Sequence, residues 1–411
     1  MADCGCDAVV LRKPLTPYEE AIDRILDQAK RLSEIETVSL NEAAGRVLAE
    51  AVVSPVNVPP ADNSAMDGYA VRAQDIQAGA RLPVSQRIPA GVMGDPLEAN
   101  TVARIFTGAP VPANADAVIM QEWVNIDEDG MANFDRTIDV GNDIRRAGED
   151  IKEGDSILEP GLKLRPQDIG LAASVGVNEL KVYRRLKVAT FFTGDELVEP
   201  GNALGKGQIY NSNQYTVNSL LDNLDCEIVN LGIVEDTLDA TRNALSKAAE
   251  SADLIITSGG VSVGEEDHVR IALEELGQLS MWKLRIKPGK PLALGNIHDT
   301  DFFGLPGNPV SAFATFVLFV RPFIRKVQGE AAYLPTKIEG VADFEWPKAG
   351  PRREFLRARI SDGSKISIYP HQGSGVLSST SWADGFAIVY EDTTVTKGDK
   401  VEFIPYSELL A

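Results

Sequence analysis

Apolar residues recur in two different rhythms along residues 186–330, the most regular part of the chain. Five short apolar runs are typical of buried strands: 188–192, 227–233, 253–256, 281–286 and 301–305. Between and after them, residues 214–224, 239–249 and 268–276 show the spacing of amphipathic helices. Strand-like and helix-like runs that alternate in this way predict an α/β domain with a mainly parallel sheet.

The rest of the chain has other patterns. Residues 15–32 and 40–48 predict helices, and residues 151–185 predict short strands around a helix at 165–174. Short strand-like runs separated by Gly, Pro and Asp-Gly turns fill residues 54–150, which we interpret as a small β module. Similar runs after residue 330 predict a small barrel or sandwich. The pattern leaves open whether residues 151–185 join the N-terminal helices, which would make the β module an insertion.

Composition and charge limit the possible functions. The chain has 411 residues, an apolar fraction of 44% and a formal net charge of −20, which argues against a general binder of nucleic acid or anionic membranes. The three cysteines and three histidines lack metal-site spacing, so a structural zinc site is not expected. The N-terminus does not resemble a signal peptide, and the longest apolar run, at 310–320, is far shorter than a membrane span of ~20 residues. We therefore expect a cytoplasmic protein.

Residues 257–267 have the order strand, glycine-rich loop, helix. Glycines at 259, 260 and 264 allow the backbone to approach a ligand closely, and hydroxyls at 258 and 262 lie among them. The loop ends in Glu265-Glu266-Asp267. Acids beside an anion-binding loop indicate a divalent cation between them, although caps of the following helix would explain them equally well. The candidate ligand-binding residues are Ser258, Gly259, Gly260, Ser262 and Gly264.

Polar clusters also follow the other predicted strands, and in α/β sheets ligands bind beyond the carboxyl ends of the strands. These clusters contain Thr193, Gly194, Asp195 and Glu196, then Asp236, then Asp267, then the cations Lys283, Lys287 and Lys290, and finally Pro306, Gly307, Asn308 and Pro309. Their joint position predicts a site for a phosphorylated ligand, a divalent cation such as Mg²⁺ and an oxyanion held by the lysines. Scattered histidines favour metal and electrostatic catalysis over covalent catalysis.

Eight motifs together resemble the molybdopterin molybdenumtransferases, the family of bacterial MoeA and the C-terminal domain of gephyrin. They run in family order across nearly the whole chain: Asp-Asn-Ser-Ala-Met-Asp-Gly-Tyr-Ala at 62–70, Thr-Gly-Ala-Pro-Val-Pro at 107–112, Arg-Arg-Ala-Gly-Glu-Asp at 145–150, Thr-Gly-Asp-Glu-Leu at 193–197, residues 257–265, Lys-Pro-Gly-Lys-Pro at 287–291, Gly-Leu-Pro-Gly-Asn-Pro at 304–309 and His-Gln-Gly-Ser at 371–374.

The resemblance implies a fold, a reaction and an assembly. It implies an elongated mixed N-terminal domain (1–53 plus 151–185), an inserted β module (54–150), a molybdopterin-binding α/β domain (186–330) and a C-terminal β-barrel (331–411). The family inserts molybdate into adenylyl-molybdopterin, hydrolyses the adenylate with Mg²⁺ and releases AMP. It works as a homodimer in which the cleft of one subunit is completed by the β module of the other. Contacts with the molybdopterin adenylyltransferase and with cofactor-accepting proteins are also implied.

The family's functional residues are carried over by motif. They predict catalytic roles for Asp67, Thr107, Asp150, Glu196, Asp236 and Asp267, with Glu196, Asp236 and Asp267 as metal ligands. Asp67, Thr107 and Asp150 would come from the partner subunit. The predicted substrate contacts include Arg145, the three lysines, Arg357 and Ser374.

Two other functions stay open from the sequence. One is the neighbouring reaction, in which an enzyme with the same type of α/β domain transfers adenylyl groups from ATP to molybdopterin. The other is a non-catalytic scaffold of the same fold. The retained acidic cluster argues against the scaffold, because it would lower folding stability without a function.

Overall fold

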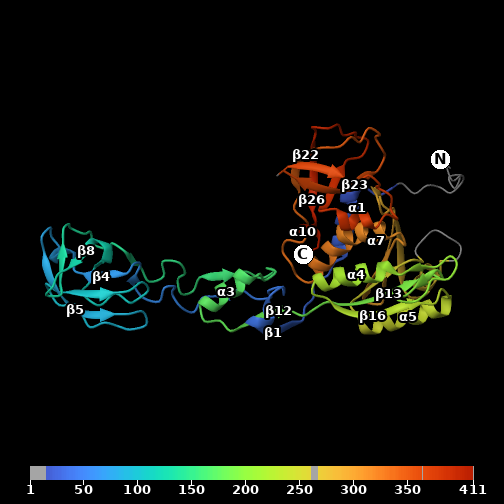
Figure 1. Cartoon of the computed structure of the whole chain (residues 1–411). Coiled ribbons are helices and arrows are strands. Elements are labelled where there is room, and N and C mark those ends of the chain that lie inside the picture. The colour runs from blue at the N-terminus through green and yellow to red at the C-terminus, as the bar shows by residue number, and fades with distance from the viewer. Residues whose placement is uncertain (1–14, 261–266, 363, 411) are drawn as a thin grey trace.

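The computed structural model describes residues 15–260, 267–362 and 364–410 and shows an elongated molecule (Figure 1). The α/β domain and a C-terminal β region lie side by side at one end, and the β module that contains β4 and β5 lies at the other. A narrow region around α3, β1 and β12 joins the two ends. No helix among the described residues is both long and apolar enough to cross a membrane.

The α/β domain is built on a six-stranded sheet with the order β16-β13-β17-β21-β20-β18. Its strands are β13 (Lys187–Thr193), β16 (Glu227–Val234), β17 (Leu254–Ser258), β18 (Gln278–Lys283), β20 (Pro291–Ile297) and β21 (Thr300–Leu305). Strands β16, β13, β17 and β21 are parallel, whereas β20 pairs antiparallel with both β21 and β18. The predicted mainly parallel sheet is confirmed.

Strand β20 is the element of this sheet that the apolar pattern did not predict. It contains Pro291, Gly295 and Asn296, residue types that usually interrupt strands. Because β18 is antiparallel to β20, and β20 to β21, strand β18 points in the same direction as β21. The carboxyl end of β18, with Lys283, therefore lies at the same sheet edge as the ends of β13, β17 and β21.

Helices cover both faces of the sheet, as a mainly parallel sheet requires. They are α4 (Ser212–Asn223), α5 (Leu238–Ser251), α6 (His268–Leu276) and a buried helical run formed by α7 (Pro309–Thr315), η3 (Phe316–Val320) and α8 (Arg321–Val327). Alternate residues of β13 face opposite sides: Phe192 packs in the core shared with α4 and α7, and Phe191 in the core shared with α5 and α6. The bounds of α6 match the prediction.

The N-terminal segment is shared between two parts of the molecule. Helix α1 (Tyr18–Gln28) is shorter than predicted, and its buried Ile22 and Ile25 belong to the core of the α/β domain. Helix α2 (Leu40–Ala43) is also shorter than predicted. Gly45 adopts φ +83° and the chain then extends, so that Val47 and Leu48 form bridges with Lys163 and Val182. A left-handed glycine of this kind ends a helix.

The narrow middle region has a small core of its own. It contains α3 (Pro166–Ser174) and two antiparallel strand pairs, β1 (Ile35–Ser39) with β12 (Glu179–Tyr183) and β2 (Val52–Val53) with β11 (Ser156–Leu158). Its two halves come from either side of the β module in the sequence. The chain thus leaves this region, forms the β module, and returns.

The β module is a six-stranded sheet with the order β7-β4-β6-β5-β9-β8. Its strands are β4 (Gly68–Val71), β5 (Arg81–Ile88), β6 (Val102–Ile105), β7 (Ala117–Met120), β8 (Val124–Ile126) and β9 (Met131–Phe134). Two 3-10 turns, η1 (Ala73–Asp75) and η2 (Gln121–Trp123), and the short pair β3 (Asn63–Ser64) with β10 (Ile144–Arg145) complete it. The predicted all-β character is confirmed.

The C-terminal region is a closed barrel, because β23 pairs with both ends of the strand order β24-β22-β26-β25. Its strands are β22 (Ile338–Ala342), β23 (Arg353–Ser361), β24 (Lys365–Ile368), β25 (Gly385–Val389) and β26 (Lys400–Pro405). Short helices α9 (Ser378–Trp382) and α10 (Tyr406–Leu409) follow β24 and β26. Of the two predicted possibilities, the barrel is correct. The sequence pattern did not predict β22.

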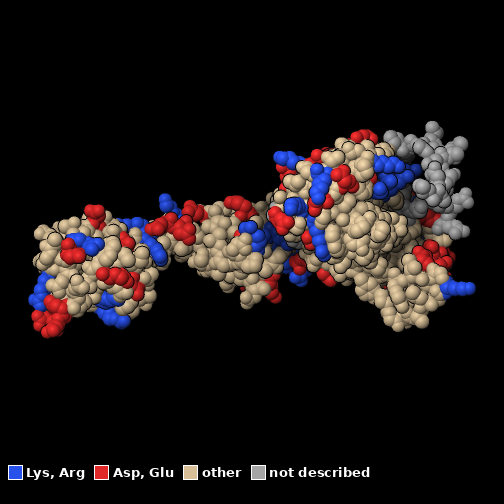
Figure 2. All heavy atoms as spheres, turned by 45° about the horizontal axis from the view of Figure 1, so that its top comes forward, with Lys and Arg blue, Asp and Glu red and all other residues tan. Residues whose placement is uncertain are grey.

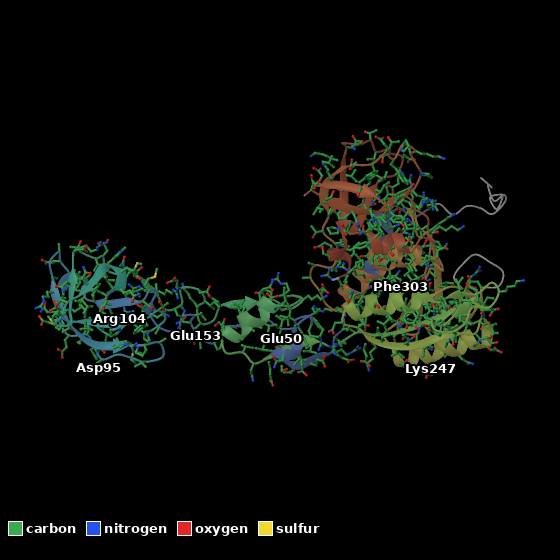
Figure 3. All side chains as sticks on the ribbon, viewed as in Figure 1. Glu50, Asp95, Arg104, Glu153, Lys247 and Phe303 are labelled. Atoms are coloured by element: carbon green, nitrogen blue, oxygen red, sulfur yellow. The ribbon has the colours of Figure 1, made fainter. Side chains whose placement is uncertain are left out.

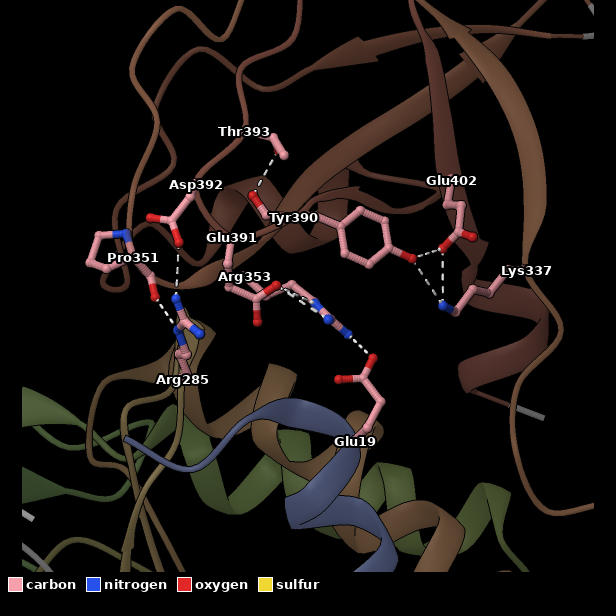
Figure 4. Close-up of polar contacts among 10 residues, drawn as sticks. All are labelled: Glu19, Arg285, Lys337, Pro351, Arg353, Tyr390, Glu391, Asp392, Thr393 and Glu402. Atoms are coloured by element: carbon pink, nitrogen blue, oxygen red, sulfur yellow. Dashed lines mark hydrogen bonds and ion pairs between the residues drawn. The ribbon is translucent and has the colours of Figure 1, made fainter. Parts of the chain in front are cut away.

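Strand pairing and polar contacts attach this barrel to the α/β domain. Strand β19 (Ile286–Lys287), which follows the sheet strand β18, pairs with β23 of the barrel. The Arg353 guanidinium binds the carboxylates of Glu19 on α1 and Glu391 of the barrel (Figure 4). Arg285 donates to Pro351 O at 2.5 Å and pairs with Asp392 at 3.1 Å. The barrel therefore has a fixed position beside the carboxyl edge of the sheet.

Candidate active site

A cleft of about 950 Å³ opens at the carboxyl edge of the sheet and is bordered on one side by barrel residues. Its walls come from the ends of β13, β17 and β21, from the segment between β18 and β20, and from a barrel loop at 372–377. The predicted site residues that line it are Thr193, Glu196, Ser258, Gly259, Gly260, Lys287, Lys290, Pro306, Gly307, Asn308, Pro309 and Ser374. The convergence of these strand ends is what the sequence predicted.

The glycine turn after β17 is shaped by close packing against β13. Gly259 adopts φ +99°, and a Cβ atom there would lie 2.3 Å from the carbonyl oxygen of Thr193. Gly260 adopts φ +60°, and its Cβ would lie 2.7 Å from a methyl group of Val269. At position 259 only glycine fits without a shift of the backbone, and at position 260 a side chain would be strained at this φ and would need the Val269 side chain to move. The described part of the turn, Gly259 and Gly260, lines the cleft, whereas Ser262 and Gly264 lie outside the described residues.

Asn213 at the start of α4 joins two of the loops. Its Nδ2 donates to Ser258 Oγ at 2.8 Å and to the carbonyl oxygen of Gly307 at 2.8 Å. Ser258 Oγ in turn donates to the carbonyl oxygen of Pro306 at 2.9 Å, and Ser258 is 3% exposed. The only proton of this hydroxyl is therefore donated to a backbone carbonyl of the protein. In this structure the Ser258 hydroxyl links the two loops. Its predicted contact with the substrate stays a prediction.

Sequence reasoning missed Asn213, because it began the helix at Gln214. The signal was present: Asn211-Ser212-Asn213 is the kind of polar run that precedes a helix, and Asn211 is the N-cap of α4. Recognising the N-cap of α4 would not, however, have placed Asn213 against Gly307, which is 94 residues away in the chain.

The barrel loop is held from both sides. Ser374 O accepts a hydrogen bond from the Val310 backbone N–H at 3.0 Å, which ties the loop to the start of α7. Gln372 exchanges hydrogen bonds with the backbone of Arg357 at 2.9 and 3.0 Å. The Arg357 guanidinium lies behind the loop, where it donates to Gly373 O at 3.3 Å and to Ser379 Oγ at 3.1 Å.

This placement changes the interpretation of Arg357. The residue is 1% exposed and is not part of the cleft wall, and burial lowers its pKa to about 10. Its observed contacts make it a support of the loop rather than the direct oxyanion contact that was predicted. Arg352, five positions earlier, does line the cleft. Arg352 was not among the predicted site residues. The pair Arg352-Arg353 just before a predicted strand was the sequence feature that could have indicated it.

The cations divide between the cleft and its surroundings. Lys287, Lys290 and Arg352 line the cleft, and Lys287 Nζ pairs with Glu354 at 3.1 Å. Lys283 is at the end of β18 but is not part of the cleft wall. In the described part of the chain neither Lys290 nor Arg352 has an ion-pair partner. Positive charge without a partner in a cleft is suited to an anionic ligand.

The predicted metal ligands do not form one cluster. Glu196 lines the cleft, Asp236 accepts from Thr193 Oγ1 at 3.1 Å, and Asp267 caps α6 by accepting from the Arg270 N–H at 3.1 Å. Asp267 is 4% exposed. Among the described residues no three Asp, Glu, His or Cys side chains come close enough to hold a metal ion. Gly194 and Asp195 are in the loop after β13, outside the cleft wall.

The remaining predicted residues lie at the other end of the molecule. Asp67 precedes β4, Thr107 follows β6, and Arg145 is in β10 (Figure 1). Asp150 lies where the chain returns from the β module, and its N–H donates to Val58 O. Hydrogen bonds from the backbone N–H and the hydroxyl of Thr107, both 2.8 Å, hold the pKa of the Asp67 carboxyl below its usual value. Within one chain these residues do not meet the cleft.

The fold and the cleft define a protein of the molybdopterin-binding class. Three family regions match in chain order: the MoeA N-terminal region (domains I and II) at residues 16–176, a probable molybdopterin binding domain at 189–326 and the MoeA C-terminal region (domain IV) at 339–406. The middle match covers the strand ends and loops that form most of the cleft wall.

The chain belongs to the molybdopterin molybdenumtransferase family. It is 42% identical to the molybdopterin molybdenumtransferase of Haemophilus influenzae, across 95% of this chain and 99% of that one. It is 38% identical to the molybdopterin molybdenumtransferase of a Nostoc species, across 84% and 83% of the two chains. The crystal structure of the molybdopterin biosynthesis MoeA protein from Pyrococcus horikoshii superposes with a TM-score of 0.84 at 31% identity, across 96% of this chain and all of that one.

Proposed function

We propose that this protein is a molybdopterin molybdenumtransferase, which inserts molybdate into adenylyl-molybdopterin and releases AMP. The observation that carries the proposal is the meeting of Lys287, Lys290 and Arg352 with two glycine-containing loops in one cleft. Molybdate is a tetrahedral dianion, and the adenylylated substrate contains a phosphoanhydride. Both need cationic and N–H donors, and a chain with a net charge of −20 must provide them locally.

Different residues of the cleft would bind the different groups of the substrates. Lys287 and Lys290 bind the oxyanion, while the fixed loops around Gly259 and Gly307 position the pterin and phosphate groups. An oxygen of water attacks the adenylyl phosphorus, the bridging P–O bond breaks, the molybdopterin phosphate keeps the bonding electron pair, and AMP departs after a proton passes to solvent. If an oxygen of molybdate attacks instead, the same P–O bond breaks, and AMP departs when its Mo–O bond is exchanged for bonds to the two dithiolene sulfurs of molybdopterin, whose protons are released. Preorganised cations stabilise the negative charge that develops in this step.

The donor set also suits Mg²⁺ in one particular mode. Mg²⁺ is usually held by one or two carboxylates together with substrate phosphates, rather than by a cage of protein side chains. Glu196 and Asp236, from the ends of β13 and β16, are the carboxylates that would hold it. When bound, the ion would neutralise charge on the phosphate oxygens. A role for Asp267 in this reaction stays a prediction.

We also propose that the protein works as a homodimer with a shared site. Asp67, Thr107 and Asp150 lie in the part of the elongated molecule that is remote from its own cleft, so they can contribute to a cleft only by meeting that of a second copy. Light scattering on the purified protein tests the dimer, and a monomer that is fully active would contradict it. Contacts with the adenylyltransferase and with cofactor-accepting proteins, and a cytoplasmic location, belong to the same proposal.

The direct test supplies adenylyl-molybdopterin and Mg²⁺ with and without molybdate, and measures AMP by chromatography. We expect AMP release that depends on molybdate. A parallel incubation with ATP, Mg²⁺ and unmodified molybdopterin distinguishes the neighbouring reaction. Formation of adenylyl-molybdopterin there, without AMP release in the first assay, would overturn the proposal in favour of an adenylyltransferase.

A further inference from the structure

Two arginines lie side by side on the sheet of the β module. Arg87 of β5 is directly opposite Arg104 of β6 in the parallel register of these strands. Both guanidinium groups lie over the ring of Phe106, at 4.5 and 4.7 Å from its centroid, and Arg104 also lies 5.2 Å from the centroid of Tyr69. Like charges directly opposite each other destabilise a sheet. The pair is therefore a local violation of the rules that stabilise the fold.

Within the described part of the chain neither Arg87 nor Arg104 forms an ion pair. Arg81, on the same strand β5, pairs with Asp127 at 2.7 Å and with Asp129 at 2.6 Å. Figure 2 shows that acidic and basic side chains are both spread over this face of the molecule. In a chain with a net charge of −20, two adjacent arginines that form no ion pair with the described residues mark a place where an external anion would be favoured.

Arg104 is also held in place. Its guanidinium donates to Gly68 O at 2.9 Å and to Gln121 Oε1 at 2.5 Å. Gly68 directly follows Asp67, and the charge of Arg104 helps to lower the pKa of the Asp67 carboxyl, after the larger effect of the Thr107 hydrogen bonds. An arginine held by hydrogen bonds and two rings loses little freedom when it binds an anion. The patch is built in advance, and it adjoins Asp67 and Thr107.

We propose that Arg87 and Arg104 bind phosphate oxygens of the adenylylated substrate while it lies in the cleft of the partner subunit. The inference rests on the proposed function, because it uses the shared cleft described above. Guanidinium groups match phosphate oxygens in geometry and charge. An acidic peptide of another protein would be the alternative ligand, and the experiment below separates the two.

The first test compares three variants that each remove one positive charge from the module. In Arg87→Gln and Arg104→Gln we expect KM for adenylyl-molybdopterin to rise roughly tenfold or more, since hydrogen bonds to charged groups are at stake. Arg87→Gln removes no hydrogen bond that the described structure contains, so it guards against a folding defect in Arg104→Gln. The matched control Arg81→Gln, on the same strand, should keep the wild-type KM. Wild-type KM in both test variants would overturn the inference and would favour a protein ligand for the patch.

The second test asks whether the patch acts across subunits. Dimers of Arg104→Gln and dimers of Lys290→Gln are mixed under conditions that allow subunit exchange. Activity is assayed at adenylyl-molybdopterin well below the wild-type KM, where both parent dimers are slow. Half of the dimers are then mixed, and each mixed dimer has one site built from an intact cleft and an intact patch, so we expect about a quarter of wild-type activity to return. Absence of recovery after confirmed exchange would show that Arg104 does not act in the partner's cleft. If the wild-type protein itself released no AMP, the proposed function would fail first, which is a different result.

Discussion

The cleft and the β module contain the same kinds of residue in opposite surroundings. At the cleft, Lys287, Lys290 and Arg352 come from two domains and meet across about 950 Å³ of open volume. In the β module, Asp67 just before β4 and Thr107 just after β6 are held together beside Arg104 of β6, and they form a partly exposed surface next to the patch of Arg87 and Arg104 (Figure 3 labels Arg104). The cleft is a large concave site that is open on one side and holds cations that form no ion pair with the described residues. The patch is preorganised but has no enclosure of its own.

The cleft and the β module are each stabilised separately. Each half is held rigid by contacts inside its own domain: Asn213 and Ser258 in the cleft, and the Thr107 and Gln121 hydrogen bonds in the module. Neither half depends on the other for its shape. In the dimer that we propose, association would bring together two surfaces that are already formed, which would limit the conformational entropy lost on binding.

The largest loss of activity is expected when a cation is removed from the cleft. Lys290→Gln should lower molybdate-dependent AMP release by about a hundredfold, as loss of one preorganised charge donor typically does. The matched control is Lys247→Gln on the exposed side of α5 (Figure 3), where no effect on turnover is expected. AMP release is measured at saturating adenylyl-molybdopterin over a range of molybdate concentrations. Equal activity of the two variants would mean that the cleft cations do not hold the oxyanion.

Rigidity of the cleft can be tested through its glycines. Gly259→Ala must place a Cβ 2.3 Å from Thr193 O at φ +99°, so we expect a loss of about 2 kcal/mol or more and a melting midpoint lower by ~4–8 °C. Gly307→Ala is the control in the same cleft, because its Cβ would have no atom within 4 Å. Its midpoint should stay within about 1 °C of the wild type. Calorimetry compares the pair, and similar melting would contradict a tightly packed turn.

The role of Asn213 predicts an effect of intermediate size. Asn213→Asp removes both donors and sets a carboxylate oxygen against the carbonyl of Gly307, so kcat/KM should fall by roughly tenfold. Asn230→Asp makes the same charge change at an exposed position whose side chain only accepts, from the Gly232 N–H, and should be silent. If Asn213→Asp kept full activity, the link between the two loops would have no part in positioning the substrate.

The smallest expected effect concerns the hydrogen bonds between Thr107 and Asp67, beside the patch of Arg87 and Arg104. Thr107→Val removes one of the two hydrogen bonds to Asp67, so the pKa of that carboxyl should rise towards its usual value of about 4. Because the folded pKa is lowered, Asp67 contributes to stability above the unfolded pKa, and this contribution disappears as the pH falls through the folded value. Carboxyl NMR titration measures the shift. In the control Thr101→Val, whose hydroxyl donates to Glu98 O, the pKa of Asp67 should not move.

Much of the local structure followed from the sequence. The periodicity of residues 268–276 predicted α6 with its observed bounds, and the glycine loops at 259 and 307 were placed at strand ends because parallel strands bring their carboxyl ends to one edge. Strand β20 was not predicted, because proline and glycine interrupt its apolar pattern. Pairing with β18 on one side and β21 on the other stabilises it. Helix α1 could be predicted, but its place in the α/β core could not, since a helix pattern does not say which partner covers its apolar face.

The sequence alone was enough to predict the family, the α/β and β character of the regions and twelve of the 27 residues that line the cleft. Local periodicity, turn chemistry and motif order are short-range properties of a chain, and they are legible without a fold. Only the tertiary structure decided that Arg357 supports a loop, that Arg352 and Asn213 belong to the cleft, and that Asp67 and Thr107 lie at the far end. Those facts depend on which distant segments pack together, and burial and hydrogen bonding between them are set by the whole fold.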